Sequence, residues 1–92
     1  MSKREVIEQA IKEIDELLAL RQGFLEAYRD WKDASAEKLK EGLGEEVAEE
    51  LERVGPREAP TNRQHRVHIF RQRLHAQRKY LQDLLASAEA QA

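Results

Sequence analysis

The sequence predicts an all-α fold with a long first helix, a short second helix and a long third helix that packs antiparallel on the first. The composition favours helix, because the chain has only four Gly and two Pro and contains few β-branched residues. The pattern favours it as well, because apolar residues recur at helical spacing along most of the 92 residues. A chain of this length is expected to form a single domain, residues 1–92.

The first helix is predicted to cover residues 3–41. It begins with a capping box, in which Ser2 caps the helix and Glu5 reaches back. Two adjacent rows of apolar residues follow at helical spacing. The first row consists of Ile7, Ile11, Ile14, Leu18, Leu25 and Tyr28, and the second of Ala10, Leu17, Phe24 and Trp31. Nothing except Gly23 lowers the helix propensity before Gly42, so we expect one uninterrupted helix that is wide enough to contact two neighbours.

Glycine-containing segments separate the remaining elements. Gly42-Leu43-Gly44 ends the first helix, and a short acidic helix is predicted over residues 45–54. Residues 55–60 are predicted to form a connector. The third helix is predicted over residues 61–90, where a capping box at Thr61 begins it. The connection between the first and third helices is too short for a crossover, so these two helices should pack antiparallel.

A thin core predicts that the chain forms a homo-oligomer. Only 40% of the residues are hydrophobic and 37% are charged, and so small a core in a short chain seldom supports a monomer. We therefore expect a helical bundle of the coiled-coil type that a second copy completes, most simply as an antiparallel dimer. The predicted interface is the second apolar row with one residue on the outer side of the third helix: Ala10, Leu17, Phe24, Trp31 and Ile69. Alternatively, the second row packs on the short helix through Val47, Leu51 and Val54.

Charge is distributed unevenly, although the formal net charge is only −2. Residues 1–60 carry 10 basic and 16 acidic side chains, whereas residues 61–92 carry 6 and 2. We therefore predict an interaction or adaptor module that binds an acidic protein through its basic third helix. The predicted contact residues are Arg66, Arg71, Arg73, Arg78 and Lys79. One alternative is ion pairing within the chain or between subunits. Another is nucleic-acid binding, which the negative net charge and the absence of a helix-turn-helix spacing disfavour.

Two polar residues interrupt the apolar rows, Arg21 in the first helix and Gln77 in the third. Burying an unpaired Arg is costly, so Arg21 must meet a carboxylate, a carbonyl oxygen, solvent or an anionic ligand. One interpretation is that both residues fix the register or the oligomeric state, as polar residues do in coiled coils. The other interpretation is that they line a ligand pocket.

A further pattern links basic residues on the first helix with the third helix. Arg4, Arg21 and Lys32 lie along the first helix, and Ile69-Phe70-Arg71 and Gln82 lie along the third. With the long, short, long order of the helices, this arrangement resembles the all-helical chorismate mutase family, although that family's Arg-Asp and Arg-Glu segment after the first helix is absent. The resemblance implies an enzyme with a dicarboxylate pocket in an intertwined dimer. Its site residues would be Arg4, Arg21, Lys32, Gln77 and Gln82.

The other motifs predict no catalytic group, cofactor or metal. The chain has no Cys, and none of its serines lies in a nucleophile motif. The three histidines fall on outward positions of the third helix with no carboxylate nearby in the sequence, so we expect no metal site. The longest run of large apolar residues, from Leu17 to Leu20, is too short to cross a bilayer. We therefore expect no membrane contact and a cytoplasmic location.

Overall fold

Four helices make up the described part of the chain: α1 (Lys3–Leu18), α2 (Phe24–Leu43), α3 (Glu45–Arg53) and α4 (Arg63–Gln91). They are seen in a computed structural model that describes residues 2–91, with side chains up to residue 87. No strand occurs between residues 2 and 91. The predicted all-α fold is confirmed.

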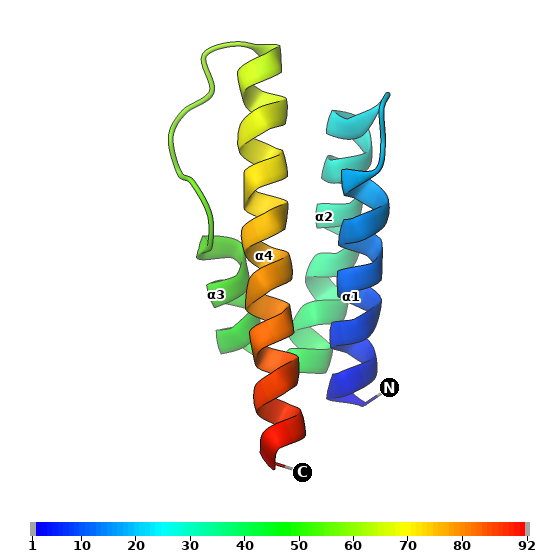
Figure 1. Cartoon of the computed structure of the whole chain (residues 1–92). Helices are drawn as coiled ribbons and strands as arrows, with labels where there is room; N and C mark the ends of the chain where they lie inside the picture. The colour runs from blue at the N-terminus through cyan, green and yellow to red at the C-terminus, as the bar shows by residue number, and fades with distance from the viewer. Residues whose placement is uncertain (1, 92) are drawn as a thin grey trace.

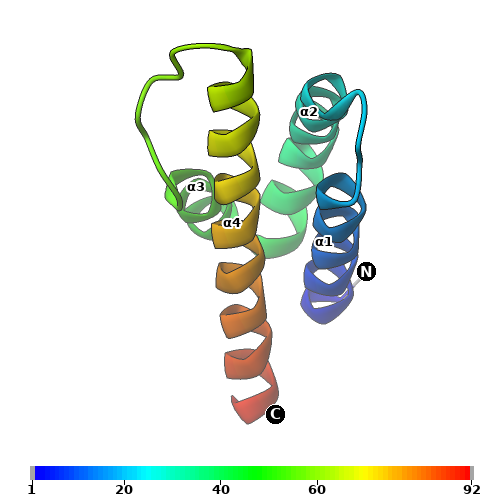
Figure 2. The same ribbon diagram turned by 45° about the horizontal axis from the view of Figure 1, so that its top comes forward.

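The three long helices α1, α2 and α4 run up and down along one axis (Figure 1). α1 and α2 form an antiparallel hairpin, α3 packs on α2, and residues 54–62 lead back to the start of α4. α4 then runs antiparallel to α1 and contacts both α1 and α3, as predicted for the first and third helices. In the view of Figure 2, α3 is seen on one side of α4 and the hairpin on the other. The molecule measures 44 × 21 × 20 Å.

The predicted uninterrupted helix over residues 3–41 is wrong. α1 ends at Leu18, the chain reverses through residues 19–23, and α2 begins at Phe24. Gly23 has a φ of 68°, a left-handed conformation that favours glycine. Arg71 of α4 donates hydrogen bonds to the carbonyl oxygens of Leu18 and Leu20 at 2.8 and 2.7 Å, which a continuous helix would have paired internally. The local propensity for helix is thus overridden by a contact from a distant segment.

The other elements lie close to their predicted ranges. α3 covers residues 45–53 and α4 covers residues 63–91, so both differ from the prediction by at most two residues at either end. The side chain of Ser2 accepts the N–H of Glu5 at 3.2 Å, as the first capping box predicts. The second cap is Asn62 rather than Thr61, because Asn62 Oδ1 accepts the N–H of His65 at 2.8 Å. α4 therefore begins later than predicted.

Both apolar rows are buried or half-buried within a single chain. Of the predicted oligomer interface, Ala10, Leu17, Phe24 and Ile69 are buried and Trp31 is half-buried. Ile69 is fully buried, and not on the outer side of its helix, because α4 packs against neighbours on more than one side. The short helix joins the core through Leu51, which is buried, and Val47, which packs on the core, whereas Val54 is half-buried. The alternative that the second row packs on this helix stays a prediction. Burial of the second row requires no second chain, and the homo-oligomer stays a prediction.

Candidate anion-binding cavity

A small cavity of about 130 Å³ lies between α2, α3 and α4. The buried part of its wall consists of Tyr28, Ser35, Leu39, Leu51 and Gln77. Half-buried residues continue the wall: Trp31, Ala48 and Arg73. The exposed rim consists of Lys32, Ala36, Glu52 and Arg57. Three helices and the connector converge here, so residues that are distant in the sequence share one site.

Gln77 of α4 lines this cavity, and one atom of its amide group has no hydrogen-bond partner in the described chain. The residue is 7% exposed, and its Nε2 donates to the carbonyl oxygen of Leu51 at 3.3 Å. Leu51 lies in the last turn of α3, where carbonyl groups have no partner within the helix. The other amide atom, Oε1, is buried without a hydrogen-bond partner in the described chain. Such an acceptor destabilises the fold by about 1–3 kcal/mol unless a donor reaches it.

Arg57 on the rim is held by the end of α3. Its Nη2 donates to the carbonyl oxygen of Glu52 at 2.7 Å, and its Nε donates to that of Arg53 at 3.3 Å. These are unpaired carbonyl groups at a helix C-terminus, where a positive charge is also favourable. The guanidinium group is therefore fixed beside the cavity opening.

Arg73 of α4 is held by the connector. An added Cβ at Gly55, which has a φ of 97°, would lie 2.9 Å from the Cα of Arg73, so the connector can approach α4 this closely only with glycine. Arg73 Nε then donates to the carbonyl oxygen of Pro56 at 2.9 Å. Its guanidinium carbon also lies 5.2 Å from the centroid of the Phe70 ring. The guanidinium carries more N–H donors than this one hydrogen bond uses.

Two aromatic residues complete the wall. Tyr28 is buried and stacks on Phe70 with the ring centroids 4.7 Å apart. Burial raises the pKa of the Tyr28 hydroxyl above its usual value, and the positive charge of Arg73 offsets part of that rise. The hydroxyl is therefore neutral at physiological pH. Trp31, the single tryptophan of the chain, donates its indole N–H to Glu13 Oε1 at 3.2 Å.

The cavity has a surplus of positive charge. Lys32, Arg57 and Arg73 line it, against a single carboxylate, that of Glu52. Lys32 is exposed and forms no ion pair with any residue that the structure describes. A concave site that is lined mainly by charges of one sign focuses their electric field and attracts ions of the opposite sign. The site can therefore bind a small anion electrostatically.

Only two of the five residues that the enzyme alternative requires lie at this cavity. Lys32 and Gln77 both line the cavity. Arg4 lies in the first turn of α1, whereas Arg21 lies in the turn beyond its other end, and both side chains are exposed. Gln82 is exposed on α4 and does not line the cavity. Because Arg21 is exposed to solvent, it needs no buried partner.

Sequence reasoning missed Arg57 and Tyr28 as cavity residues and gave Arg73 another role. Arg57 belongs to the connector, whose path depends on tertiary contacts at Gly55 and Pro56. A signal for Arg73 was nevertheless present. It precedes Gln77 by one helical turn, so both must lie on the same face of the third helix.

The predicted basic surface of the third helix is also divided. Arg71 donates to carbonyl groups at the end of α1 and lies 4.5 Å from the centroid of the Phe24 ring. Arg78 pairs with Asp15 at 2.6 Å, which confirms the alternative of ion pairing within the chain for this residue. Arg66 and Lys79 are exposed. Only part of the predicted set therefore faces solvent.

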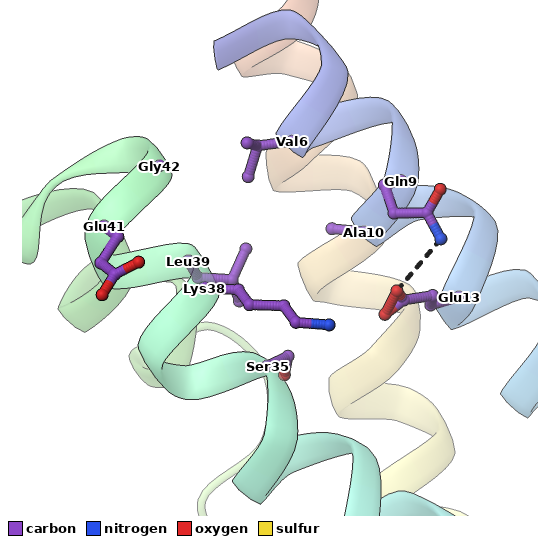
Figure 3. A pocket seen from close by; sticks show the side chains of 9 residues that line it. All are labelled: Val6, Gln9, Ala10, Glu13, Ser35, Lys38, Leu39, Glu41 and Gly42. Atoms are coloured by element: carbon purple, nitrogen blue, oxygen red, sulfur yellow. Dashed lines mark hydrogen bonds between the residues drawn. The ribbon is translucent and has the colours of Figure 1, made fainter. Parts of the chain in front are cut away.

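A second hollow, of about 300 Å³, lies between α1 and α2 (Figure 3). Its floor contains the small or apolar residues Val6, Ala10, Ser35, Leu39 and Gly42, and its edges are polar. At one edge Gln9 Nε2 donates to Glu13 Oε2 at 3.3 Å, and Lys38 extends from the facing helix. Among the described side chains, the buried unpaired polar atom is that of Gln77, which does not line this hollow. The cavity at Gln77 is therefore the chemically more specific of the two.

No metal site and no known relative points to a particular ligand. In the part of the chain that the structure covers, no three His, Cys, Asp or Glu side chains lie close enough to hold a metal ion. No helix in that part is long and apolar enough to cross a membrane. Comparisons with protein-family models, curated proteins and solved structures found no match for this chain.

Proposed function

We propose that the protein is a small helical binding module that holds a small organic anion in the cavity between α2, α3 and α4. The observation that carries this proposal is the convergence of three cationic side chains and one carboxylate on a single concave site. Ligand sites typically combine apolar and aromatic walls with a few fixed polar groups. Tyr28 and Trp31 supply the aromatic part here, and Gln77 supplies a buried polar group.

Two features favour a carboxylate as the anionic group. Planar guanidinium groups match carboxylates, with which they form paired hydrogen bonds. Arg57 and Arg73 are already held by main-chain carbonyl groups, so little side-chain entropy is lost when an anion binds.

The size of the cavity limits the ligand. An apolar cavity of about 150 Å³ holds a ring of about six carbon atoms. The cavity of about 130 Å³ therefore suits a molecule of two to four carbon atoms or one end of a larger ligand. Binding of so small a molecule is expected to be weak, because it offers few contacts.

A fluorescence titration tests the proposal. Trp31 lines the cavity and is the single tryptophan, so its emission should change saturably with acetate, propionate, lactate or succinate at low ionic strength. Lys32→Glu should lower the affinity about tenfold, because it reverses a charge at the rim. Lys38→Glu is the matched control, since Lys38 is also exposed on α2 but lines the other hollow. It should change the affinity by less than about twofold.

Either of two results would reject anion binding at this cavity. One is that no carboxylate in the series gives a saturable change. The other is that Lys32→Glu and Lys38→Glu weaken binding equally, which would mean that only the overall charge of the protein matters.

The second candidate is the adaptor function, a homo-oligomer that binds an acidic protein through α4. Arg66 and Lys79 favour it, because both are exposed on a helix that has no acidic residue before Asp83. Homodimer and coiled-coil assembly belong to this candidate, as does the predicted cytoplasmic location. The chorismate-mutase-like alternative would need Arg4 and Arg21 from a second chain to complete the site at Lys32 and Gln77.

A further inference from the structure

We propose that the hollow between α1 and α2 is a second binding site, which takes a small uncharged aromatic molecule beside the ammonium group of Lys38. This site is separate from the anion-binding cavity, and the inference does not depend on the proposed function. The class of ligand is a single aromatic ring with at most a small substituent.

The first step is the shape of the hollow, which contacts between the two helices bound at both ends. At one end, α1 and α2 approach so closely that an added Cβ at Gly42 would lie 2.7 Å from Val6 Cγ2. At the other end, the indole N–H of Trp31 donates to Glu13 Oε1 at 3.2 Å. Between these contacts the side chain of Ala10 is too small to fill the space, and about 300 Å³ stays open (Figure 3).

The second step is the size of the occupant. An apolar cavity of about 150 Å³ holds a benzene molecule, so the hollow of about 300 Å³ admits a ring with a small substituent. Nine residues line the hollow, whereas a stable protein–protein interface uses about 20–30 residues on each partner. The hollow is therefore too small to dock a protein by itself, and it fits a small molecule.

The third step is the polarity of the occupant. The floor of the hollow is mainly apolar, so an apolar molecule that covers it removes this surface from water. The edges carry both signs of charge, and in the view of Figure 3 Lys38 lies between the carboxylates of Glu13 and Glu41. A charged ligand would meet a like charge as well as an opposite one. An uncharged ligand avoids this repulsion.

The fourth step is the preference for an aromatic ring, which comes from Lys38. Figure 3 shows its side chain extending from α2 toward α1 at the hollow. Its ammonium group forms no ion pair with any residue that the structure describes. Glu13 instead accepts hydrogen bonds from Gln9 and Trp31, one at each carboxylate oxygen. An ammonium group within about 6 Å of the centre of an aromatic ring is attracted to its face, and a saturated ring offers no such attraction.

The test compares four probes that share one carbon skeleton: benzyl alcohol, cyclohexylmethanol, benzoate and benzylamine. Each is titrated against the intact protein, and binding is followed by NMR through the methyl resonances of Val6. Val6 lines this hollow and not the anion-binding cavity, so benzoate that binds in that cavity does not interfere. Benzyl alcohol should bind at least about threefold more tightly than each of the other three probes.

Variants then assign the site. Lys38→Met keeps the length of the side chain but removes the charge, so benzyl alcohol should bind no more tightly than cyclohexylmethanol. Lys40→Met is the matched control, because Lys40 is exposed on the same helix and does not line the hollow. Ala10→Leu fills the hollow and should weaken the binding of both alcohols at least about tenfold. Ala34→Leu, at an exposed position of α2, should change it by less than about twofold.

Each contrary result overturns the proposal at a different step. If no probe shifts the Val6 resonances saturably, the hollow is not a binding site. If cyclohexylmethanol binds as tightly as benzyl alcohol, or if Lys38→Met keeps the preference, Lys38 does not select an aromatic ring. If benzoate or benzylamine binds more tightly than benzyl alcohol, the ligand is not an uncharged one. The comparison of probes on the unmodified protein decides the proposal even if Ala10→Leu fails to fold.

Discussion

At the scale of single residues, the guanidinium group of Arg71 joins α4 to the end of α1. It donates to two main-chain carbonyl groups, those of Leu18 and Leu20, and lies over the ring of Phe24. These partners lie in or directly beside residues 19–23, where the chain reverses direction. Arg71 is thus part of the fold, although its position on a basic helix made it a predicted contact for an external partner.

Arg71→Met is expected to lower the free energy of unfolding by about 2–3 kcal/mol, because it removes charge-assisted hydrogen bonds and a cation–π contact. Chemical denaturation would measure the change. Arg66→Met is the control, since Arg66 is exposed on the same helix and should change stability by no more than about 0.5 kcal/mol. Equal effects of the two variants would show that the contacts of Arg71 do not stabilise the reversal.

The residues of the candidate site differ in how far the sequence could predict them. Gln77 stands out from its sequence neighbours, because it is a polar residue at an apolar position of a helical row. Whether such a residue fixes register or lines a cavity depends on what packs against it, and Leu51 is distant in the sequence. Arg57 has no such pattern around it. Its place at the cavity follows from the path of the connector and from the unpaired carbonyl groups of α3.

At the scale of helices, the sequence predicts the presence of helix better than its continuity. Capping and apolar spacing place α3 and α4 within two residues, because both depend on local interactions. The break at residues 19–23 depends instead on packing. Apart from Gly23, a continuous helix and a hairpin satisfy the same local preferences, and the hairpin brings both apolar rows into the core of one chain.

Gly23→Ala tests how strongly the turn depends on glycine. An added Cβ at Gly23 meets no atom closer than 3.9 Å, so its effect comes from the left-handed backbone alone. The variant should lower the free energy of unfolding by about 1–2 kcal/mol. Gln22→Ala is the control, because among the described residues no position other than glycine has a positive φ. An equal effect of both variants in chemical denaturation would contradict a special role for Gly23.

At the scale of the whole molecule, one chain forms a hydrophobic core despite the low apolar content. The two rows that seemed to require a second chain cover each other once the first helix folds back, and α4 and α3 cover the rest. The uneven distribution of charge is also partly balanced within the chain. Arg78 of the basic helix pairs with Asp15 of the acidic segment, so part of the basic helix is neutralised within the chain. The amino-acid composition alone predicts neither the packing of the two rows nor the ion pair.

This arrangement predicts that stability does not depend on protein concentration. Leu17 and Phe24 are buried inside one chain, so unfolding should need no dissociation, and the Tm should stay constant between about 1 and about 100 µM. Leu17→Asp should lower the Tm equally at every concentration, because it places a charge in the core of each copy. Light scattering measures the mass of the protein in solution, and a second measurement with an acidic peptide shows whether such a partner changes its assembly. A Tm that rises with concentration, together with a dimer mass, would instead support the homo-oligomer and with it the adaptor function.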